Sequence, residues 1–465
     1  MNSESAGPGA GASQTTVTMP TNQIINLKSL ALHCEFEGQG VPAVGDFSTG
    51  GTVVSKGVYA LCPRGGVSAL VQKLSWSAGG VALDNGPTPY SVIHAVKNGT
   101  ENSLDKMLTD QKVLNNSVIH EFVGVNASGN DVPGSGALPP GSDDGKEPAT
   151  EKSRYGQNIE LICNEWYGFT EANPCFIDTN LLPELRLTIQ WEGQNVLPIQ
   201  FQGLALGKYE AADETNKRGI ANASYALRKM FWTVDCVSFT NGLLDAMNER
   251  MMADDGALDV VYPQYQTFSV DQQSASSSVR GGVSTMSLNR VYGLQRCATG
   301  NAPQNQALSY NEQQPPVAVQ EQQIGFKFNN AFTNFGVLGV SEYQFKINNA
   351  PYPMYRETPL GGYNSICTSN ARTYKHNEGS QIGSAAVWKG NMWSPCVSLN
   401  HPADQRFISG LDLRSINSQV NWDVYKDSIS TEAGGLSGLS RQVMLMTEQS
   451  SLLKIGGGRS LAVIA

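Results

Sequence analysis

Two parts of the chain have similar sequences, and this internal repetition restricts the folds that the chain can adopt. In the first part, Phe176–Ile177 precedes a leucine-rich stretch, an alternation of polar and apolar residues, and Trp191. In the second part, Phe407–Ile408 precedes a similar stretch and Trp422 at the same interval. Self-similarity along a chain marks duplicated structural units. We therefore expect two similar units, with Trp191 and Trp422 at equivalent positions in their cores.

A second repeated pattern lies earlier in each half. An alternating strand pattern ends in a turn rich in Gly, Asn and Pro, and a Tyr-x-x-Ile motif follows. The apolar positions of the strands are Leu74, Trp76 and Ala78 in the first half and Tyr343, Phe345 and Ile347 in the second, and the motifs are Tyr90–Ile93 and Tyr363–Ile366. Alternation with a period of two is typical of a half-buried β-strand. Both units are therefore expected to be β-sandwiches.

The composition favours short strands joined by long polar loops. Of the 465 residues, 16% are charged and 40% hydrophobic, and there are 48 Gly and 22 Pro. A helical bundle would need more Glu, Lys, Leu and Ala. About eight strand candidates fall in each unit, with turn residues between them, and strands do not alternate with helices. The sequence thus predicts an all-β fold of two tandem jelly-roll β-sandwiches (a double jelly roll), with short helices in the connections.

The organisation along the chain follows from local composition. Residues 1–20 are mostly Gly, Ala, Ser and Thr, which is typical of disorder. Asn241 is a suitable N-cap for a helix at 243–252. The long polar stretches 127–153 and 295–323 are expected to be surface loops, because strand patterns resume after each. The predicted segments are a disordered N-terminal arm at 1–20, a first jelly roll at 21–240, a linker helix at 241–256 and a second jelly roll at 257–465.

The charge argues against one class of partner. The formal net charge is −9, the isoelectric point is about 5.2, and no cluster of Lys and Arg occurs. A protein that wraps nucleic acid usually carries a basic patch, so we expect no extensive or sequence-specific nucleic-acid binding by the folded body. A low charge density instead suits a surface that is buried against copies of the same chain, because the cores of interfaces are depleted in charge.

The cysteines indicate a reducing compartment. None of the eight lies in a CxxC or other metal-like spacing; they are Cys34, Cys62, Cys163, Cys175, Cys236, Cys297, Cys367 and Cys396. Several lie inside apolar strand patterns, where a free thiol behaves as a small hydrophobic group. Residues 1–14 lack the apolar core of a signal peptide, and no apolar run approaches the length of a transmembrane span. We therefore expect free thiols.

No motif predicts catalysis, metal binding or a cofactor. The five histidines, at positions 33, 94, 120, 376 and 401, form no HxH or HExxH motif. Ser437 lies in a Gly/Ser-rich stretch that does not match GxSxG. The glycines at 456–458 lack the Lys-Ser/Thr of a phosphate loop, and the acidic pairs at 143–144 and 254–255 lack the spacing of a calcium site. We predict no catalytic, cofactor-binding or metal-binding residue, no cofactor, and no enzymatic activity.

Several segments, taken in order, resemble double jelly-roll major capsid proteins of eukaryotic DNA viruses. The similarity is greatest to polinton-like viruses and virophages, and nucleocytoplasmic large DNA viruses are more distant. The segments are Cys62–Gly66, Leu74–Trp76, Tyr90–Ile93, Phe176–Leu182, Leu185–Gln190, Tyr225–Asp235, Leu243–Met252, Phe345–Asn349, Pro351–Pro353, Ser409–Asp412 and Leu453–Ile464. They cover nearly the whole chain after residue 20. The long loops at 127–153 and 295–323 depart from the family pattern.

The resemblance implies a structural role. Subunits of this family form homotrimers whose six rolls make a pseudo-hexameric capsomer, and these tile an icosahedral shell around a double-stranded DNA genome. The implied partners are further copies of the chain, neighbouring capsomers, and penton and minor capsid proteins, in a virion assembled inside the host cell. The alternative is a bilobed β-sandwich glycan-binding protein or hydrolase, because paired carboxylates can meet in space without a sequence motif. A secreted adhesin would normally bring a signal peptide and paired cysteines.

Overall fold

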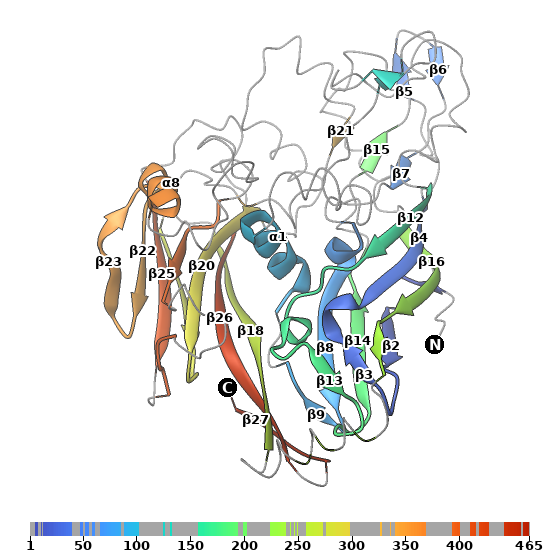
Figure 1. Cartoon of the computed structure of the whole chain (residues 1–465). Helices are drawn as coiled ribbons and strands as arrows, with labels where there is room; N and C mark the ends of the chain where they lie inside the picture. The colour runs from blue at the N-terminus through green and yellow to red at the C-terminus, as the bar shows by residue number, and fades with distance from the viewer. Residues whose placement is uncertain are drawn as a thin grey trace.

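Two β-sandwiches follow one another along the chain in the computed structural model (Figure 1). The first lies near the N-terminus, and the second contains the C-terminus. The structure describes residues 5–7, 11, 13–39, 47–49, 52–54, 58–60, 66–84, 88–101, 124–125, 131–132, 157–193, 199–201, 224–238, 242, 246, 249, 257–272, 276–297, 326–327, 335, 340–368, 393–399, 410–414, 418–426, 441–456 and 459–464.

The first sandwich consists of two antiparallel four-stranded sheets. One has the order β1-β16-β4-β12, with β1 at Ser5–Ala6, β16 at Ser224–Thr233, β4 at Ala31–Gln39 and β12 at Gln157–Cys163. The other has the order β2-β14-β8-β9, with β2 at Gln14–Thr18, β14 at Leu185–Trp191, β8 at Val71–Ala78 and β9 at Val81–Ala82. Short strands β3 (Ile24–Asn26), β13 (Phe176–Asp178) and β17 (Cys236–Val237) form a separate sheet.

The second sandwich has the same plan. One sheet has the order β18-β26-β20-β24, with β18 at Ala257–Gln272, β26 at Arg441–Gly456, β20 at Leu288–Cys297 and β24 at Cys396–Ser398, and β27 (Ser460–Ile464) also pairs with β26. The other has the order β19-β25-β22-β23, with β19 at Ser277–Gly282, β25 at Gln419–Lys426, β22 at Val340–Ile347 and β23 at Ala350–Glu357.

The strand order shows that both sandwiches are jelly rolls. In chain order, the eight main strands are β1, β2, β4, β8, β9, β12, β14 and β16 in the first roll and β18, β19, β20, β22, β23, β24, β25 and β26 in the second. In each roll, the first, eighth, third and sixth of these strands form one sheet, and the second, seventh, fourth and fifth form the other. Two four-stranded sheets connected in this way define the jelly roll. The predicted all-β double jelly roll is therefore confirmed.

The repeated strand-turn-helix pattern corresponds to equivalent hairpins. Strands β8 and β9 are joined by Gly79–Gly80, and β22 and β23 by Asn348–Asn349, and all four turn residues have positive φ, between 48° and 86°. Two-residue hairpin turns favour Gly and Asn because they require this backbone conformation. A helix follows each hairpin: α1 (Tyr90–Glu101) in the first roll and α8 (Pro359–Thr368) in the second.

The predicted equivalence of Trp191 and Trp422 is wrong by four residues. The hairpin turns align Trp76 with Phe345; Leu187 lies opposite Trp76, and Trp422 lies opposite Phe345. Leu187 is therefore the counterpart of Trp422 in the equivalent strand. The equal Phe-to-Trp interval was not a reliable guide to this register. Phe176 lies in a separate sheet, and Phe407 lies outside the described residues.

Both tryptophans are nevertheless buried, because a shift by an even number of residues keeps a side chain on the same face of a strand. Trp191 is 4% exposed, and Trp422 is fully buried. In the second roll, the Trp393 ring packs against those of Trp422 and Tyr343, each with a centroid distance of 5.7 Å. Aromatic side chains therefore form a contiguous cluster within the core of the second roll.

The predicted disordered arm at 1–20 is also wrong for its described part. Residues 14–18 form β2, which pairs with β14 from Arg186 to Gln190, and Ser5–Ala6 pair with β16. Thr15, Val17 and Met19 are buried. The abundance of small and polar residues obscured a period-two pattern that includes β-branched side chains, which favour strands. The first roll therefore begins before residue 21.

The predicted linker helix lies mostly outside the described residues. Of positions 241–256, the structure describes Gly242, Ala246 and Glu249, and the Ala246 N–H donates to the Gly242 carbonyl at 3.1 Å. That spacing is the one found in an α-helix. The described parts of the predicted loops at 127–153 and 295–323 are the short strand β11 (Asp131–Val132) and the end of β20. The domain boundaries at 240 and 257 stay predictions.

Candidate functional site: the buried junction between the two jelly rolls

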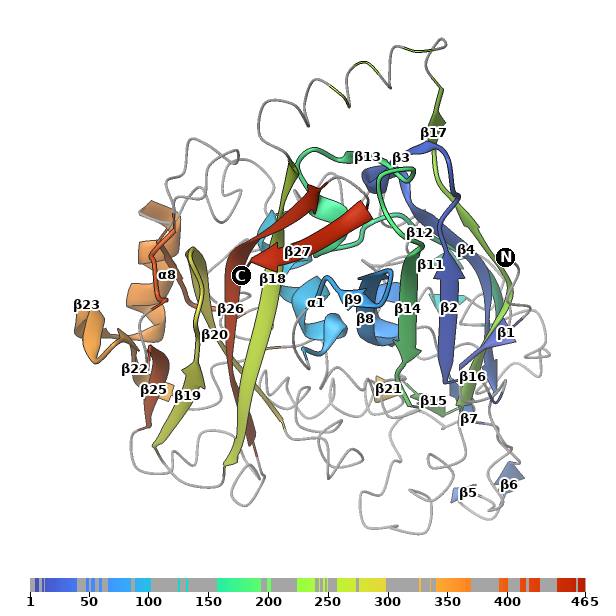
Figure 2. The same ribbon diagram turned by 90° about the horizontal axis from the view of Figure 1, so that it is seen from below.

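Helix α1 of the first roll lies between the two rolls, against the sheet that contains β18, β26 and β20 (Figures 1 and 2). It begins at Tyr90, shortly after Pro87 and Pro89. Seven of its residues are 6% exposed or less, on all sides of the helix: Tyr90, Ser91, Val92, Ile93, His94, Val96 and Lys97. A helix buried all round lies within a core. Here the core is shared by both halves of the chain.

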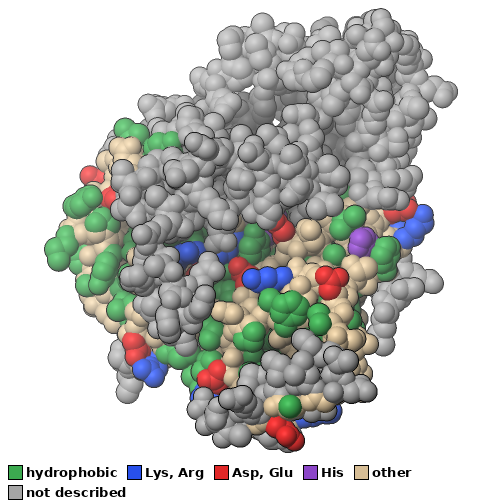
Figure 3. All heavy atoms as spheres, viewed as in Figure 1, with side chains coloured by type: hydrophobic (Ala, Val, Ile, Leu, Met, Phe, Trp, Pro, Cys, Tyr) green, Lys and Arg blue, Asp and Glu red, His purple; other side chains and the backbone are tan. Residues whose placement is uncertain are grey.

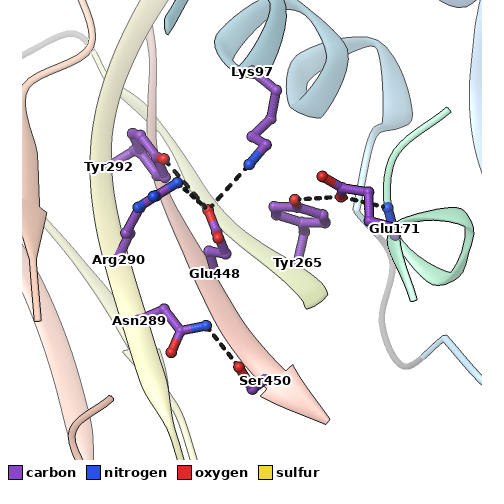
Figure 4. A network of polar contacts seen from close by, with 9 residues as sticks. Lys97, Glu171, Tyr265, Asn289, Arg290, Tyr292, Glu448 and Ser450 are labelled. Atoms are coloured by element: carbon purple, nitrogen blue, oxygen red, sulfur yellow. Dashed lines mark hydrogen bonds and ion pairs between the residues drawn. The ribbon is translucent and has the colours of Figure 1, made fainter. Parts of the chain in front are cut away.

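A buried lysine of α1 reaches the second roll. Lys97 is 3% exposed, and its Nζ lies 3.6 Å from Oε2 of Glu448 on β26 (Figure 4). The same ammonium group lies 5.9 Å from the ring centroid of Tyr167 and 5.7 Å from that of Tyr265. Aromatic faces attract a cation most strongly where water is excluded. The charge of Lys97 is thus compensated by a carboxylate and two aromatic rings.

Glu448 accepts three polar contacts at one oxygen. Besides Lys97, the Nη1 of Arg290 and the hydroxyl of Tyr292 both lie 3.4 Å from Glu448 Oε2. Burial alone would raise the pKa of Glu448, but the charges of Lys97 and Arg290 and the Tyr292 hydroxyl outweigh burial and lower this pKa below its ordinary value. The carboxylate is therefore ionised at neutral pH. It is stable in the interior only while these partners remain.

A second set of bonds crosses the junction beside this network. The hydroxyl of Tyr265 on β18 donates to Glu171 Oε2 at 2.9 Å, and the same oxygen accepts the N–H of Gly168 at 3.0 Å (Figure 4). The hydroxyl of Thr88, just before α1, donates to the carbonyl of Tyr265 at 2.8 Å. Tyr265 thus donates to the first roll through its side chain and accepts from it through its backbone.

Backbone groups join the rolls as well. The carbonyl of Leu83 accepts bonds from the Tyr262 hydroxyl at 2.6 Å and from Gln264 Nε2 at 2.7 Å. Asn173 and Val261 exchange two N–H to carbonyl bonds, at 2.8 and 3.0 Å. Each of these bonds has a preferred direction, so together they fix one orientation of the rolls. The junction can hold the two rolls as a single rigid block.

A small sheet also takes strands from both halves of the chain. Its order is β21-β15-β7, with β21 at Phe326–Lys327, β15 at Ile199–Phe201 and β7 at Val58–Ala60. Strand β15 pairs with β7 from its own half and with β21 from the other half. Figure 1 shows this sheet on the far side of α1 from the β18–β27 end of the molecule. The two halves are therefore joined at a second place.

The two histidines that the structure describes do not come together at this junction. His33 lies on β4 and stacks on Phe231. His94 lies in α1, and burial lowers the pKa of its imidazole to about 4. His120, His376 and His401, like Ser437 and the two acidic pairs, lie outside the described residues. Among the residues that the structure describes, no group of three or more His, Cys, Asp or Glu side chains is placed to hold a metal ion.

The described cysteines are free thiols. Cys34, Cys163 and Cys396 are buried, Cys175 is partly buried, and Cys236 is exposed. Burial raises the pKa of Cys163 and of Cys396 to about 12, so neither thiol is a nucleophile at neutral pH. The side chains of Cys62, Cys297 and Cys367 lie outside the described part of the structure. Within that part, no helix has both the length and the apolar character needed to cross a membrane.

Sequence analysis did not find the junction. The polar side chains around Glu448 and Glu171 are Lys97, Tyr265, Arg290 and Tyr292. One signal was present: Thr447–Ser451 is a polar run inside an apolar strand, between Val443–Met446 and Leu452–Ile455. All five residues of this run are 9% exposed or less. Buried polar groups need partners. For Glu448 in β26, one partner is Lys97 on α1 of the other roll.

Comparison with solved structures identifies the architecture. The crystal structure of PBCV-1 VP54 fitted into a cryo-EM reconstruction of the virophage Sputnik has a TM-score of 0.53 and 9% identity, covering 97% of this chain and 92% of that chain. A quasi-atomic model of the PBCV-1 virus capsid gives a TM-score of 0.51 and 10% identity over the same shares. The Faustovirus major capsid protein has a TM-score of 0.48 and 11% identity, covering 96% of this chain and 88% of that chain. No family model and no curated protein matches the sequence.

At these identities, the first two likenesses show the fold alone. They span both jelly rolls, so the correspondence covers the tandem arrangement and not one sandwich. The resemblance to double jelly-roll major capsid proteins is therefore confirmed at the level of the fold. Both of these solved structures are components of viral capsids.

Proposed function

We propose that this chain is a major capsid protein. It self-assembles as homotrimers, and the six rolls of each trimer form a pseudo-hexameric capsomer that tiles an icosahedral shell around a double-stranded DNA genome. The observation that carries the proposal is the pair of jelly rolls locked together by a buried junction. A shell tile must keep its shape while neighbours bind on several sides. A block whose halves are joined by Lys97, Glu448 and Tyr265 meets that need.

The composition of the chain supports self-association. Sheets present edges and faces that a protein must cover, shorten or charge if they are not to associate. With 16% charged residues, the chain has fewer charges than usual to keep copies apart. Stable assembly interfaces commonly bury about 2,000–5,000 Å². Two rolls in one rigid block provide surface for such interfaces at both ends of the molecule.

The proposed partners are other copies of this chain, neighbouring capsomers, and penton and minor capsid proteins. The proposed location is the virion capsid, after assembly inside the host cell. Five free cysteines are consistent with assembly in a reducing compartment. The net charge of −9 argues against sequence-specific binding of the genome by the folded body. We propose no cofactor, no metal and no catalytic residue.

The mass of the purified chain in solution tests the proposal. Light scattering coupled to size exclusion, at micromolar concentration and near-physiological salt, should give three times the chain mass of 49.9 kDa. Negative-stain images should show particles with a pseudo-hexagonal outline. A bilobed glycan-binding protein or hydrolase has no need of a trimer, so a stable monomer under these conditions would favour that alternative and count against the capsid proposal.

A further inference from the structure

The contacts at the junction explain only part of the buried polar run in β26. Glu448 has a partner on α1, and Ser450 accepts a bond from Asn289 Nδ2 at 2.8 Å (Figure 4). Side chains alternate between the two faces of a strand, so Gln449 and Ser451 point to the opposite face of the sheet. Both of these side chains are fully buried, with exposed fractions of 0%. A separate explanation is therefore needed for this second face.

Strand pairing places further polar side chains beside these two. In the register of β18 with β26, Gln264 lies opposite Gln449, and Tyr262 lies opposite Ser451. Residues directly opposite one another in an antiparallel pair share a face of the sheet. All four residues are 2% exposed or less. We call this group the inner polar site.

The inner polar site contains four buried polar atoms that have no hydrogen-bond partner among the described residues. They are Oε1 and Nε2 of Gln449, Oγ of Ser451 and Oε1 of Gln264. The Nε2 of Gln264, by contrast, donates to the Leu83 carbonyl at 2.7 Å and to the Tyr262 hydroxyl at 3.2 Å. Buried polar atoms in folded proteins are nearly always bonded to protein or to ordered water, because leaving them unbonded is costly. Four such atoms on directly opposed residues indicate a bound molecule.

The chemistry of the four atoms defines the class of that molecule. The two amide oxygens accept hydrogen bonds, the amide nitrogen donates them, and the hydroxyl does either. Lys, Arg, Asp and Glu side chains are visible at the surface in Figure 3, whereas every side chain of the inner polar site is uncharged. A buried ion would have no opposite charge in this group to compensate it. The molecule is therefore small and neutral, and it both donates and accepts hydrogen bonds.

We propose that the inner polar site binds ordered water. The oxygen and the nitrogen of one amide point in different directions, so the two ends of Gln449 need at least two water molecules. One water bridges Gln449 Nε2 to Gln264 Oε1, and the other bridges Gln449 Oε1 to Ser451 Oγ. A buried water has roughly two to four polar partners, and each bridge provides two.

The bound water lies next to the contacts that join the two rolls. Gln264 is the connecting residue, because its Nε2 bonds the Leu83 carbonyl of the first roll while its Oε1 bonds water in the second. Its amide is thus held in one orientation from both sides. This inference concerns a single chain, and it stands whether or not the chain builds a capsid.

The substitution Gln449→Met tests the proposal, because its effect has opposite signs with and without water. Met is unbranched like Gln, so the shape of the side chain is nearly kept. With water bound, the variant loses both bridges and leaves Ser451 Oγ and Gln264 Oε1 unbonded, so the urea midpoint should fall. In a dry site the variant would remove two unbonded buried atoms, which is neutral or stabilising. The control is Gln190→Met on β14, where the side chain is exposed and the midpoint should stay near that of the wild type.

A crystal structure at a resolution that shows ordered water tests the site directly. The wild type should show two water peaks within hydrogen-bond distance of the Gln449 amide, and both should be absent in Gln449→Met. A dry site, or a direct bond between Gln449 Nε2 and Gln264 Oε1, would overturn the proposal even if altered packing lowered the urea midpoint. A midpoint for Gln449→Met at or above that of the wild type would also overturn it.

Discussion

At the scale of single residues, Lys97 carries the charge balance of the junction. Replacing it with Met leaves Glu448 buried with Arg290, at 3.4 Å, as its remaining cationic partner among the described residues. Breaking a buried ion pair typically costs about 3–5 kcal/mol, and because Arg290 remains we expect Lys97→Met to lower the free energy of unfolding by about 3 kcal/mol. Urea denaturation measures this change.

A matched control is the exposed pair Lys454–Asp259, whose nitrogen and oxygen lie 4.0 Å apart with side chains 44% and 52% exposed. Exposed pairs contribute about 0–1 kcal/mol, so Lys454→Met should change the free energy of unfolding by no more than about 1 kcal/mol. Equal losses in the two variants would show that burial of Lys97 gives it no special role.

His94 predicts a pH dependence of stability. Its pKa is about 4 in the folded chain, against an ordinary value of 6.5, because burial disfavours the charged ring. Between these values the unfolded chain binds a proton that the folded chain does not, so stability falls as the pH falls from about 6.5 towards 4. At pH 5 the expected loss relative to pH 7 is about 2 kcal/mol, from 1.36 kcal/mol per pKa unit.

The variant His94→Asn cannot titrate in this range, so its stability should depend less on pH. Chemical denaturation of wild type and variant at pH 7 and pH 5 gives the difference directly. Because other groups titrate equally in both proteins, their contributions cancel. If the two proteins lose the same stability on acidification, His94 is already charged in the folded state.

At the scale of elements, β2 shows what local composition conceals. Val17 is 5% exposed and packs inside the first roll, whereas Thr16 next to it on the same strand points outward. A charge at position 17 would be buried without a partner, which costs several kcal/mol. Val17→Asp should therefore lower stability by at least about 2 kcal/mol, and Thr16→Asp should have an effect within about 0.5 kcal/mol. Thermal unfolding of both variants measures the difference.

This pair of variants also tests the correction to the N-terminal arm. If Val17→Asp melts like the wild type, residues 14–18 are not part of the first roll. An equal loss in the two variants would instead mean that the alternation of buried and exposed positions along β2 is misplaced.

Strands β20 and β25 approach closely at a glycine. A Cβ atom on Gly293 would lie 2.3 Å from Cε2 of Trp422, closer than any such contact allows. Overpacking a core typically costs about 1–3 kcal/mol. Gly293→Ala should therefore lower the free energy of unfolding by an amount in this range. A Cβ atom placed on Gly282 of β19 would have no neighbouring atom within 4 Å, so Gly282→Ala is the control. Urea unfolding of the two variants should separate them, and a neutral Gly293→Ala would mean that Trp422 can move aside.

These elements also show how far the sequence determines the prediction. The hairpins were recognisable because Gly79–Gly80 and Asn348–Asn349 mark turns locally and the flanking strands alternate. The position of Trp191 relative to Trp422 was not recognisable from the sequence. The register of β14 and of β25 is set by pairing with β8 and β22, which lie far away in the sequence. The partner of Glu448 was hidden for the same reason, since Lys97 lies on the other roll. Long-range contacts leave only indirect traces, such as a polar run within an apolar strand.

At the scale of the whole molecule, the junction unites the two duplicated rolls. Helix α1 of the first roll lies against the β18-β26-β20-β24 sheet of the second roll, and its Lys97 contacts Glu448 there. The two halves are joined a second time in the small β21-β15-β7 sheet.

The junction predicts that the two rolls unfold together. Calorimetry of the wild-type chain at a fixed concentration should give a single transition, with the calorimetric enthalpy equal to the van't Hoff enthalpy for the cooperative unit. Lys97→Met combined with Tyr265→Phe removes the contact with Glu448 and the hydroxyl donated to Glu171, both of which cross between the rolls. This double variant should split the transition in two, because each roll keeps its own core. The control is Tyr355→Phe, which removes a hydroxyl from an exposed tyrosine. If the double variant still unfolds in one step, the contacts at Leu83, Asn173 and β15 are sufficient to couple the rolls, and the polar network around Glu448 is not what joins them.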